Sequence, residues 1–478
     1  MTPINNGQEF KVTCGLDIGS SSITCAIGHV NRGNKQVKLQ GISSKPSVGI
    51  KKGVITNRDE LIDTLENVLS ETELMANIKI TNIVLSITGD HIRSLNTQAA
   101  IPLNRSNVQS ATNHDRAIDS GDIFQVLDLA QAVSLPVDRD ILHTLPQEYL
   151  VDTLDEIKNP LGMTGRRLEG RVHLVTAATT AMSNLVNCVE ELGISVDGLV
   201  FQPLASALST LEDDEMELGV TLVEIGSSTT NIAVYHAGSI RHSAVIPIGS
   251  ASITNDIAVM LQVSINEAET IKMKYASAKS SMSSSELDIQ LDSKEGQLKR
   301  SIPEQEVSKY VEARMQEIFQ MVIQEISRAD IKDPLTYGIV MTGGGAELRN
   351  IIPLAENSMG VKVRIGRPTK IEGTQDIADE PRYATVMGLL LWPFHAMDHT
   401  RMQKPKSGSL KVIIEKIKVD SQVIKSIMYN YVLEILTVKF HTGQKYDYFK
   451  VPNDTFISLK YFAHSTIRSV CLHKNAGI

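Results

Sequence analysis

Residues 15–28 decide the fold of this chain and read GLDIGSSSITCAIG. An alternating apolar run ends here and β-forming residues resume a few positions later, which predicts a hairpin with IGSSS at its tip. Small residues at a hairpin tip let backbone N–H groups approach a phosphate closely, and hydroxyl groups add further donors. Asp17, at the end of the first strand, is placed to orient water around a phosphate-bound Mg²⁺. The candidate phosphate-binding residues are Gly19, Ser20, Ser21 and Ser22.

An ordinary serine-rich turn would look the same, but the pattern occurs twice in this chain. Residues 219–240, GVTLVEIGSSTTNIAVYHAGSI, again run from an apolar strand through an acid, Glu224, into Ile-Gly and a cluster of small hydroxyl residues. Two such units predict two similar halves, each presenting a hairpin to one ligand. The second set of candidate residues is Gly226, Ser227, Ser228 and Thr229.

A third glycine-rich element occupies residues 337–351, YGIVMTGGGAELRNI. An apolar strand runs into Gly343, Gly344 and Gly345, and a helix is predicted to begin near Ala346. Glycines at this point let a flat group lie against the backbone. Each element alone is a weak indication, whereas the ordered set of hairpin, hairpin and strand–GGG–helix is a strong one.

Composition bounds the remaining possibilities. A chain of 478 residues is too long for one compact core and predicts at least two domains. The net charge is −8, yet residues 401–478 carry 13 Lys and Arg against 5 Asp and Glu, which predicts a separate basic module at this end. The four cysteines form no CxxC pair, and no signal-peptide core or membrane-spanning run is visible. We therefore expect a cytosolic protein whose membrane contact, if any, is peripheral.

The ordered set resembles the actin-like ATPase superfamily and, within it, the FtsA family of bacterial cell-division proteins. The stretches most similar to that family are LHTLPQEYLVDTLDEIKNPLGMTGRRLEGRVHLVTA, VRIGRP, RYATVMGLLLW and GIKKGVITNRDEL, at residues 142–177, 363–368, 382–392 and 49–61. The resemblance implies an α/β fold with two actin-like domains around a nucleotide cleft, in which one actin subdomain is replaced by a relocated small domain.

The resemblance also implies an order of parts along the chain. The expected limits are 1–92 for the first actin-like domain, 93–174 for the inserted subdomain, 175–215 for the return to the first domain, and 216–395 for the second domain, with a small subdomain at about 250–335. A linker, 396–409, and a C-terminal α+β module, 410–478, would follow.

Family likeness further implies that ATP and Mg²⁺ are the ligands. The two hairpins would grip the phosphates, with Mg²⁺ held by Asp17 through water, and the GGG loop would border the adenosine. Glu269 and Lys272 lie on a predicted helix whose start Ser264 and Glu267 mark as a capping box. They share a face of that helix and would flank the adenosine, although a surface ion pair explains them equally well.

The second hairpin departs from the pattern of efficient ATPases. Its head is Glu224 in place of Asp, Ser227 stands where Gly is usual, and Asn231 replaces an Asp. A carboxylate displaced by about one ångström can cost on the order of a hundredfold in rate. Gln202, in FQPLASALSTL, could orient an attacking water or merely begin a helix. We therefore expect ATP binding with at most slow hydrolysis, and Glu224 and Gln202 are only weak catalytic candidates.

Residues 304–329 predict a long amphipathic helix, with apolar residues recurring at helical spacing. In the FtsA family this subdomain binds the acidic, hydrophobic C-terminal tail of FtsZ, and a charged groove suits such a disordered peptide. Arg314 is the candidate contact. The preceding serine-rich segment, residues 277–286, is expected to be an exposed loop.

The basic tail resembles a KTSC domain after a linker at residues 402–409. Residues 410–427 fit either an interfacial helix, as FtsA proteins use to anchor to membranes, or a β-strand. The runs ILTVKF and KYDYFKV, joined by HTGQ, predict a hairpin, and a helix is expected after Pro452. Interleaved Lys and aromatic residues could bind nucleic acid, but the core and solvated face of a small domain explain them better.

The leading function is an ATP-binding scaffold. It would form protofilaments with itself, tether FtsZ filaments to the cytoplasmic face of the membrane, and recruit other division proteins. An actin-fold kinase for a small molecule, which needs a carboxylate base where Asn231 stands, is one alternative. A pilus-assembly scaffold of the same fold is another, and residues 142–177 argue against it.

Overall fold

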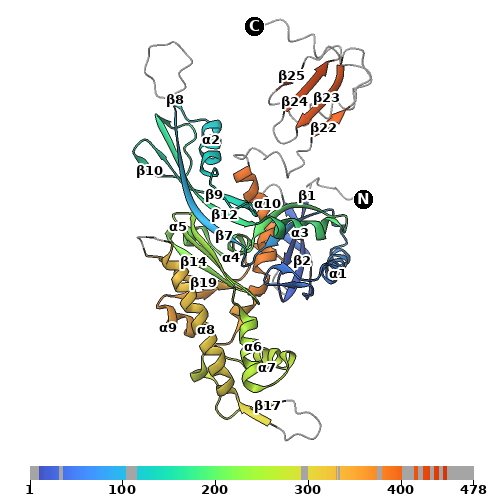
Figure 1. Cartoon of the computed structure of the whole chain (residues 1–478), viewed down its shortest axis with the longest axis vertical. Helices are drawn as coiled ribbons and strands as arrows, with labels where there is room; N and C mark the ends of the chain where they lie inside the picture. The colour runs from blue at the N-terminus through green and yellow to red at the C-terminus, as the bar shows by residue number, and fades with distance from the viewer. Residues whose placement is uncertain are drawn as a thin grey trace, which may run out of the picture. The chain divides into compact units, whose positions relative to one another are not determined.

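The computed structural model describes residues 10–31, 36–103, 116–291, 300–329, 331, 334–373, 379–400, 414–417, 424–430, 435–440 and 445–448. The chain divides into two units at the bond between Met402 and Gln403, and each unit is described by itself. Within the larger unit, elements far apart in the sequence combine into two core sheets and an inserted subdomain (Figure 1).

The first half is built on a six-stranded sheet in the order β13-β6-β1-β2-β3-β21. The strands are β13 (Ser195–Phe201), β6 (Asn82–Ile87), β1 (Phe10–Ile18), β2 (Ser22–Asn31), β3 (Val37–Pro46) and β21 (Ile371–Glu372). Helices α1 (Arg58–Ala76) and α3 (Thr179–Glu190) pack together, while α4 (Gln202–Thr210) and α10 (Ala384–Thr400) form a second pair that contacts β1 and β6. Because helices cover both faces, β2 is buried almost continuously and does not alternate.

The second half is built on a five-stranded sheet in the order β16-β15-β14-β19-β20. Its strands are β16 (Ser239–Ile246), β15 (Thr230–His236), β14 (Val220–Ile225), β19 (Ile339–Thr342) and β20 (Val363–Ile365). Helix α8 (Glu304–Ser327) packs against β15 and β16, and α9 (Ile351–Met359) contacts α8 and β20. The small subdomain adds α6 (Ser250–Leu261), α7 (Ile265–Tyr275), β17 (Asp288–Leu291) and β18 (Arg300–Pro303).

The predicted amphipathic helix is confirmed as α8, which begins at Glu304 and ends at Ser327. Its apolar residues at helical spacing are buried in the core of the second half, namely Val307, Val311, Met315, Ile318 and Val322. A helix predicted near Ala346 begins later than expected. A short 3₁₀ turn covers Gly344–Glu347, and α9 starts only at Ile351 because Asn350 adopts a left-handed conformation, with φ of 59°.

The inserted subdomain is a four-stranded antiparallel sheet in the order β10-β9-β12-β7. Its strands are β10 (Leu154–Ile157), β9 (Arg139–Val151), β12 (Arg167–Ala178) and β7 (Arg93–Pro102), and α2 (Ser120–Ala130) packs on β7 and β12. Three of its side chains donate to backbone carbonyls of β16: Ser94 to Ser243, Asn96 to Arg241 and Gln147 to Ile240. The subdomain therefore satisfies acceptors along the free edge of the five-stranded sheet.

Helices α4 and α10 cross at the join between the halves. Gly388 of α10 lies so close to α4 that an added Cβ would stand 1.7 Å from the carbonyl oxygen of Ala205. One continuous apolar core extends across this join, from Leu16 of β1 to Leu222 of β14. The two helices are therefore in backbone contact, and position 388 has no room for a side chain.

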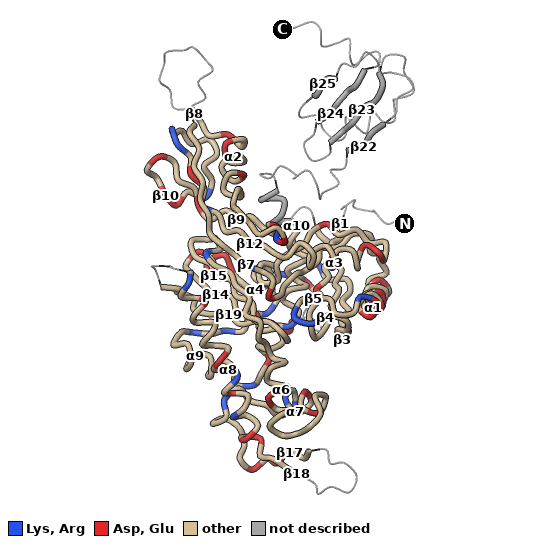
Figure 2. Tube along the Cα trace, in the orientation of Figure 1, with Lys and Arg blue, Asp and Glu red and all other residues tan. Residues whose placement is uncertain are grey.

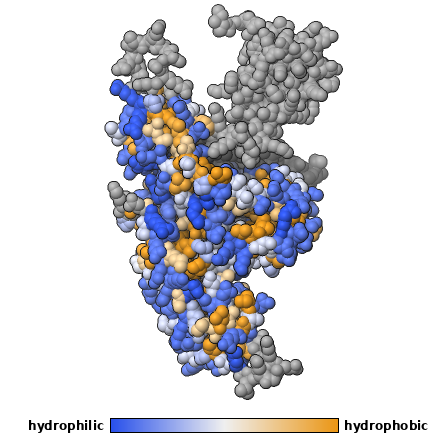
Figure 3. All heavy atoms as spheres, in the orientation of Figure 1, coloured by the Kyte–Doolittle hydropathy of each residue, from blue (hydrophilic) through white to orange (hydrophobic). Residues whose placement is uncertain are grey.

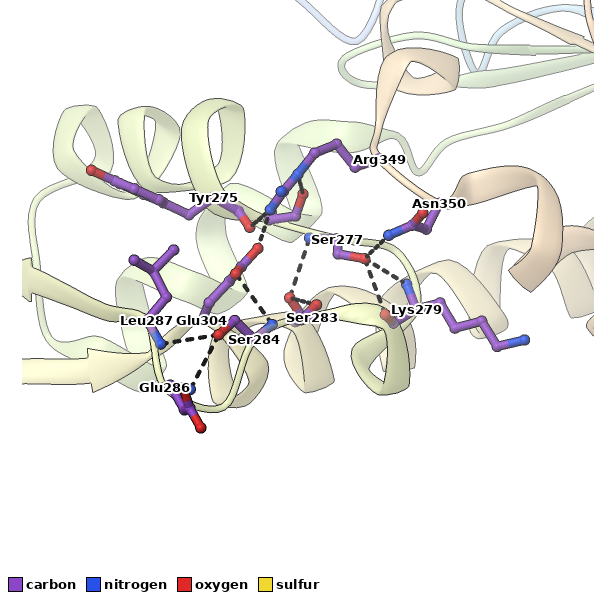
Figure 4. A network of polar contacts seen from close by, with 12 residues as sticks. Tyr275, Ser277, Lys279, Ser283, Ser284, Glu286, Leu287, Glu304, Arg349 and Asn350 are labelled. Atoms are coloured by element: carbon purple, nitrogen blue, oxygen red, sulfur yellow. Dashed lines mark hydrogen bonds and ion pairs between the residues drawn. The ribbon is translucent and has the colours of Figure 1, made fainter.

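The predicted serine-rich loop, residues 277–286, is exposed over most of its second half, whereas its first residues are buried. Ser277 is buried, its hydroxyl accepts from the amide of Asn350 at 2.9 Å, and its backbone N–H donates to Ser308 of α8 (Figure 4). Ser280 donates both its N–H and its hydroxyl to the Glu312 carboxylate. Serine hydroxyls and local backbone groups satisfy one another in such turns, so the segment folds as a fixed connection between α7 and α8.

The smaller unit contains a four-stranded antiparallel sheet in the order β22-β23-β24-β25. The strands are β22 (Ile414–Ile417), β23 (Ile424–Asn430), β24 (Ile435–Phe440) and β25 (Lys445–Tyr448). The predicted hairpin is confirmed as β24–β25, and the described parts of residues 410–427 are strands, not an interfacial helix. The helix expected after Pro452 lies outside the described residues. No helix among the described residues is long and apolar enough to span a membrane.

Candidate functional site at the junction of the two halves

The first predicted hairpin is confirmed as β1–β2, which pair antiparallel from Phe10–Asn31 to Ile18–Ile23. The turn is closed by a bond of 3.0 Å from the Gly19 N–H to the Ser22 carbonyl. Among the described residues, the N–H groups of Ser20 and Ser21 donate to no protein acceptor. These two donors are free to meet a ligand at the tip.

The second hairpin, β14–β15, repeats this arrangement. The Gly226 N–H donates to the Thr229 carbonyl at 2.9 Å, and the N–H groups of Ser227 and Ser228 have no acceptor in the described part of the chain. Gly343 and Gly345 pack directly on the end of β14, where an added Cβ would stand 2.7 Å and 3.0 Å from the carbonyl oxygen of Ile225. The GGG loop and the second hairpin are therefore neighbours.

A chain of side-chain hydrogen bonds joins the two hairpins. Gln202, the first residue of α4, donates from Nε2 to Asp17 Oδ1 at 2.7 Å. Its Oε1 accepts from Asn231 Nδ2 at 3.1 Å, and the same amide donates to Glu224 Oε2 at 3.0 Å. We call these four residues, Asp17, Gln202, Glu224 and Asn231, the interdomain junction.

Four further residues donate from their hydroxyl groups to members of the interdomain junction, and the sequence analysis named none of them. Ser86 donates to Asp17 Oδ1 at 2.6 Å and Thr88 donates to Asn231 Oδ1 at 2.7 Å. Ser206 and Thr385 both donate to Glu224 Oε1. A signal for the first two existed, because they end β6, which runs parallel to β1, and ligand-site residues gather at the carboxyl ends of adjacent parallel strands.

The two weak catalytic candidates are both engaged within the protein. Both carboxylate oxygens of Glu224 accept hydrogen bonds, and its side chain is buried. Gln202 uses its amide nitrogen on Asp17 and its amide oxygen on Asn231. Neither is placed to act on a ligand without first breaking one of these bonds.

Asp17 is the carboxylate that remains available. Its Oδ1 accepts from Ser86 and Gln202, whereas its Oδ2 accepts from no described residue. Burial raises the pKa of Asp17 to about 6, and the charge of Glu224 adds to this, while the bonds from Ser86 and Gln202 oppose it. No cation among the described residues contributes to this pKa, so the ionised Asp17 carboxylate would be stabilised by a bound cation.

The predicted pair on α7 is in contact, with 2.7 Å between Lys272 Nζ and Glu269 Oε2. Lys272 is buried and also donates to the hydroxyl of Thr254 at 3.0 Å. Ser264 caps this helix by accepting from the Glu267 N–H at 3.1 Å. A buried ammonium held between α6 and α7 is a fixed charge, not a loose surface pair.

Arg314 lies on α8, along which charges of both signs alternate (Figure 2). Its guanidinium donates to Asp256 Oδ2 at 2.7 Å and Oδ1 at 2.9 Å, and also to Glu317. These bonds raise the pKa of Arg314 above its ordinary value. An acidic partner would have to compete with these two carboxylates for the cation.

No group of three or more His, Cys, Asp and Glu side chains is gathered in a metal-binding arrangement within the described ranges. Asp17 therefore offers a single carboxylate, which suits a hydrated cation held mainly by another anion.

Comparison with known proteins assigns the family. A model described as "Cell division protein FtsA" matches residues 221–388, one described as "SHS2 domain inserted in FTSA" matches 89–176, and a "KTSC domain" matches 420–467. The chain is 39% identical to the cell division protein FtsA of Pseudomonas aeruginosa over 385 residues, which cover 80% of this chain and 90% of that protein. The chain belongs to the FtsA family.

Other comparisons agree with this family and its fold. FtsA of Escherichia coli K12 is 34% identical over 389 residues, covering 80% of this chain and 90% of that protein. Among solved structures, a PilM–PilN type IV pilus biogenesis complex aligns with a TM-score of 0.57 at 16% identity, covering 80% of this chain and 98% of that one. The likeness to the PilM–PilN complex shows only that the fold is actin-like.

Family membership decides between the functions weighed from sequence. The chain is an actin-like cell-division protein of the FtsA family, with the FtsA-type inserted domain and a KTSC domain. A pilus scaffold shares the fold, but identities of 34% to 39% to FtsA proteins place this chain in cell division. The kinase alternative loses its support, because Asn231 is an amide bonded within the protein.

Proposed function

We propose that this chain is an ATP-binding scaffold that tethers FtsZ filaments to the cytoplasmic face of the membrane, forms protofilaments with itself and recruits later division proteins. The observation that carries the proposal is the interdomain junction, where one hydrogen-bonded chain connects two hairpins with unoccupied N–H donors. We also propose that the domain limits follow the order expected from the sequence.

In this proposal the hairpin tips hold the ATP phosphates, and the GGG loop with Glu269 and Lys272 borders the adenosine. Mg²⁺, when bound, would neutralise phosphate charge, with Asp17 orienting its waters. Glu224 stays on Ser206 and Thr385, so it supports the junction and does not activate water. ATP turnover is therefore slow.

Binding of a fluorescent ATP analogue, with and without Mg²⁺, tests the nucleotide proposal. Ser228→Glu places a negative charge at a hairpin tip and is expected to weaken binding by at least about tenfold through phosphate repulsion. Ser281→Glu adds the same charge to an exposed serine of the α7–α8 connection and serves as the matched control. Equal affinities for the two variants, or no binding by the wild-type chain, would overturn the proposal.

The FtsZ tail is proposed to bind the small subdomain. Exposed apolar side chains gather on α6 and α7, among them Val259, Met260 and Met273, and this surface is visible in the lower part of Figure 3. An acidic, hydrophobic peptide would place its apolar residues there and its carboxylates near Arg314.

Fluorescence anisotropy with an FtsZ C-terminal peptide tests this contact. Arg314→Ala should weaken binding by at least about fivefold, because a partly buried cation is lost from the site. Lys309→Ala, on the same helix with its exposed ammonium paired to Glu306, is the control and should change affinity by less than about twofold. A loss of equal size in both variants would refute a specific role for Arg314.

Membrane contact is proposed to come from the basic C-terminal unit. The described parts of residues 410–427 are strands, so attraction to anionic lipids would rest on the charge of residues 401–478. Co-sedimentation with anionic vesicles, in the presence of ATP, should pellet the full chain but not a chain cut after Gln403. If neither pellets, tethering is lost or supplied by a partner, and the C-terminal unit has another role.

A further inference from the structure

His143 joins the inserted subdomain to the first core sheet. It lies on β9, is buried, and accepts a hydrogen bond of 3.0 Å at Nε2 from the backbone N–H of Phe201. Strand β13 is the outer strand of the six-stranded sheet, and Phe201 is its last residue. His143 therefore supplies an acceptor that no neighbouring strand provides, and a buried N–H without one is costly.

The residue after Phe201 is Gln202, the centre of the interdomain junction. Gln202 donates to Asp17 at 2.7 Å and accepts from Asn231 at 3.1 Å. Phe201 has a backbone N-cap conformation but no side-chain cap, so local bonding leaves the entry to α4 weakly fixed. The His143 bond fixes the Val200–Phe201 peptide group, one residue before the side chain that holds Asp17.

The ring of His143 also packs against the ring of Trp392, which lies on α10. The two ring centroids are 5.4 Å apart and their planes are inclined by 59°. Trp392 is the single tryptophan of the chain, and α10 also carries Thr385, which donates to Glu224. One histidine of the inserted subdomain thus contacts both the residue that precedes α4 and a side chain of α10.

We propose that His143 is a positioning residue of the nucleotide site, which couples the docking of the inserted subdomain to the orientation of Gln202 and Asp17. The inference rests on the proposed binding of Mg²⁺–ATP at the junction. Because coupling between two sites is reciprocal, a protein that shifts the inserted subdomain changes nucleotide affinity, and nucleotide binding changes the seating of the subdomain by the same factor.

Two substitutions at one position separate the roles of the ring. His143→Phe keeps a ring beside Trp392 but removes the acceptor for the Phe201 N–H. His143→Gln keeps an acceptor at about the same reach but removes the ring. Ser94→Ala removes a different bond between the inserted subdomain and β16 and serves as the docking control.

The measurement uses the full chain and compares its affinity for ATP with and without Mg²⁺. His143→Phe should reduce the gain in affinity due to Mg²⁺ by at least about fivefold, because Gln202 is no longer fixed in the orientation that holds Asp17. His143→Gln and Ser94→Ala should retain that gain within about twofold, since both leave an acceptor for Phe201. A folded His143→Phe chain with the wild-type gain would overturn the inference, and His143→Leu, which also has no acceptor, replaces it if it does not fold.

Hydrogen exchange on the nucleotide-free chain provides a test that does not depend on ATP. His143→Phe should speed exchange of the Phe201 amide by at least about tenfold, and His143→Gln should not. If the wild-type chain binds no ATP, the proposed function fails while exchange still tests the His143 bond. Unchanged protection of Phe201 in His143→Phe would refute the inference even if ATP binds.

Discussion

Thr88 donates a hydrogen bond of 2.7 Å to the side-chain oxygen of Asn231, although the two residues are 143 positions apart and lie in opposite halves of the larger unit. The amide of Asn231 continues the connection to Glu224 and Gln202. The side-chain amide of Asn231 both accepts and donates without carrying a charge, and this lets the two halves bond to each other.

Asn231→Asp should destabilise the protein. The new carboxylate would face Glu224 Oε2, at a position now occupied by a donor 3.0 Å away, and two like charges at that distance cannot both stay ionised. We expect the free energy of unfolding to fall by about 2 kcal/mol, measured by chemical denaturation. The double substitution Asn231→Asp with Glu224→Gln restores a donor facing an acceptor and should recover most of this loss; equal destabilisation of both chains would contradict the argument.

Nucleotide affinity should depend on pH through Asp17. Burial raises the pKa of this carboxyl from 3.8 to about 6, so it gains a proton as the pH falls through about 6 and no longer attracts Mg²⁺. Affinity for Mg²⁺–ATP should fall by up to about tenfold per pH unit below that value. Calorimetric titrations from pH 5 to 8 check this, and Asp17→Asn should bind more weakly without the same pH dependence.

In the nucleotide-free protein, lowering the pH has the opposite effect: through Asp17 it raises the free energy of unfolding. The folded chain holds the Asp17 proton more tightly than the unfolded chain does, because its pKa is the higher of the two. The contribution of Asp17 to the free energy of unfolding is therefore present below pH 3.8 and is lost as the pH rises through about 6. Thermal unfolding of the wild-type chain and Asp17→Asn across this range measures the difference.

Gly388→Ala should separate α4 from α10. The added Cβ would lie 1.7 Å from the Ala205 carbonyl oxygen, a backbone atom that cannot turn aside. We expect a loss of about 3 kcal/mol or more in the free energy of unfolding, together with altered fluorescence of Trp392 on the same helix. Gly198→Ala is the control, because no atom lies within 4 Å of its added Cβ.

Arg349→Ala should loosen the start of α8. Arg349 pairs with Glu304, which is 4% exposed and begins that helix, and it also donates to the Tyr275 carbonyl. Without it the Glu304 carboxylate keeps, within the described ranges, only a weak backbone donor from Ser284 at 3.3 Å, so we expect a loss of about 1 to 3 kcal/mol. Amide exchange in residues 304–308 should rise, whereas Arg328→Ala, which breaks an exposed pair with Glu325, should leave it unchanged.

The sequence by itself determined the elements whose cause is local. The IGSSS turn follows from small residues between two β-forming runs, the α8 core face from apolar residues at helical spacing, and the Glu269–Lys272 contact from their separation on one helix. Each depends on residues close together in the chain, so periodicity and turn chemistry were sufficient to predict them. The inserted subdomain was predicted only from the resemblance to the FtsA family, because the sequence of its strands does not indicate which part of the protein they pack against.

Only the tertiary structure decided how polar side chains are paired. Glu224 is bonded to Thr385 across 161 positions, His143 to Phe201 across 58, and Ser277 to Asn350 across 73. Ser277, at the start of a serine-rich loop that composition predicts to be exposed, is buried because α8 and Asn350 supply its partners. Sheet order and the crossing of α4 with α10 bring these groups together, and a hydrogen bond exists only where both partners arrive at the right distance.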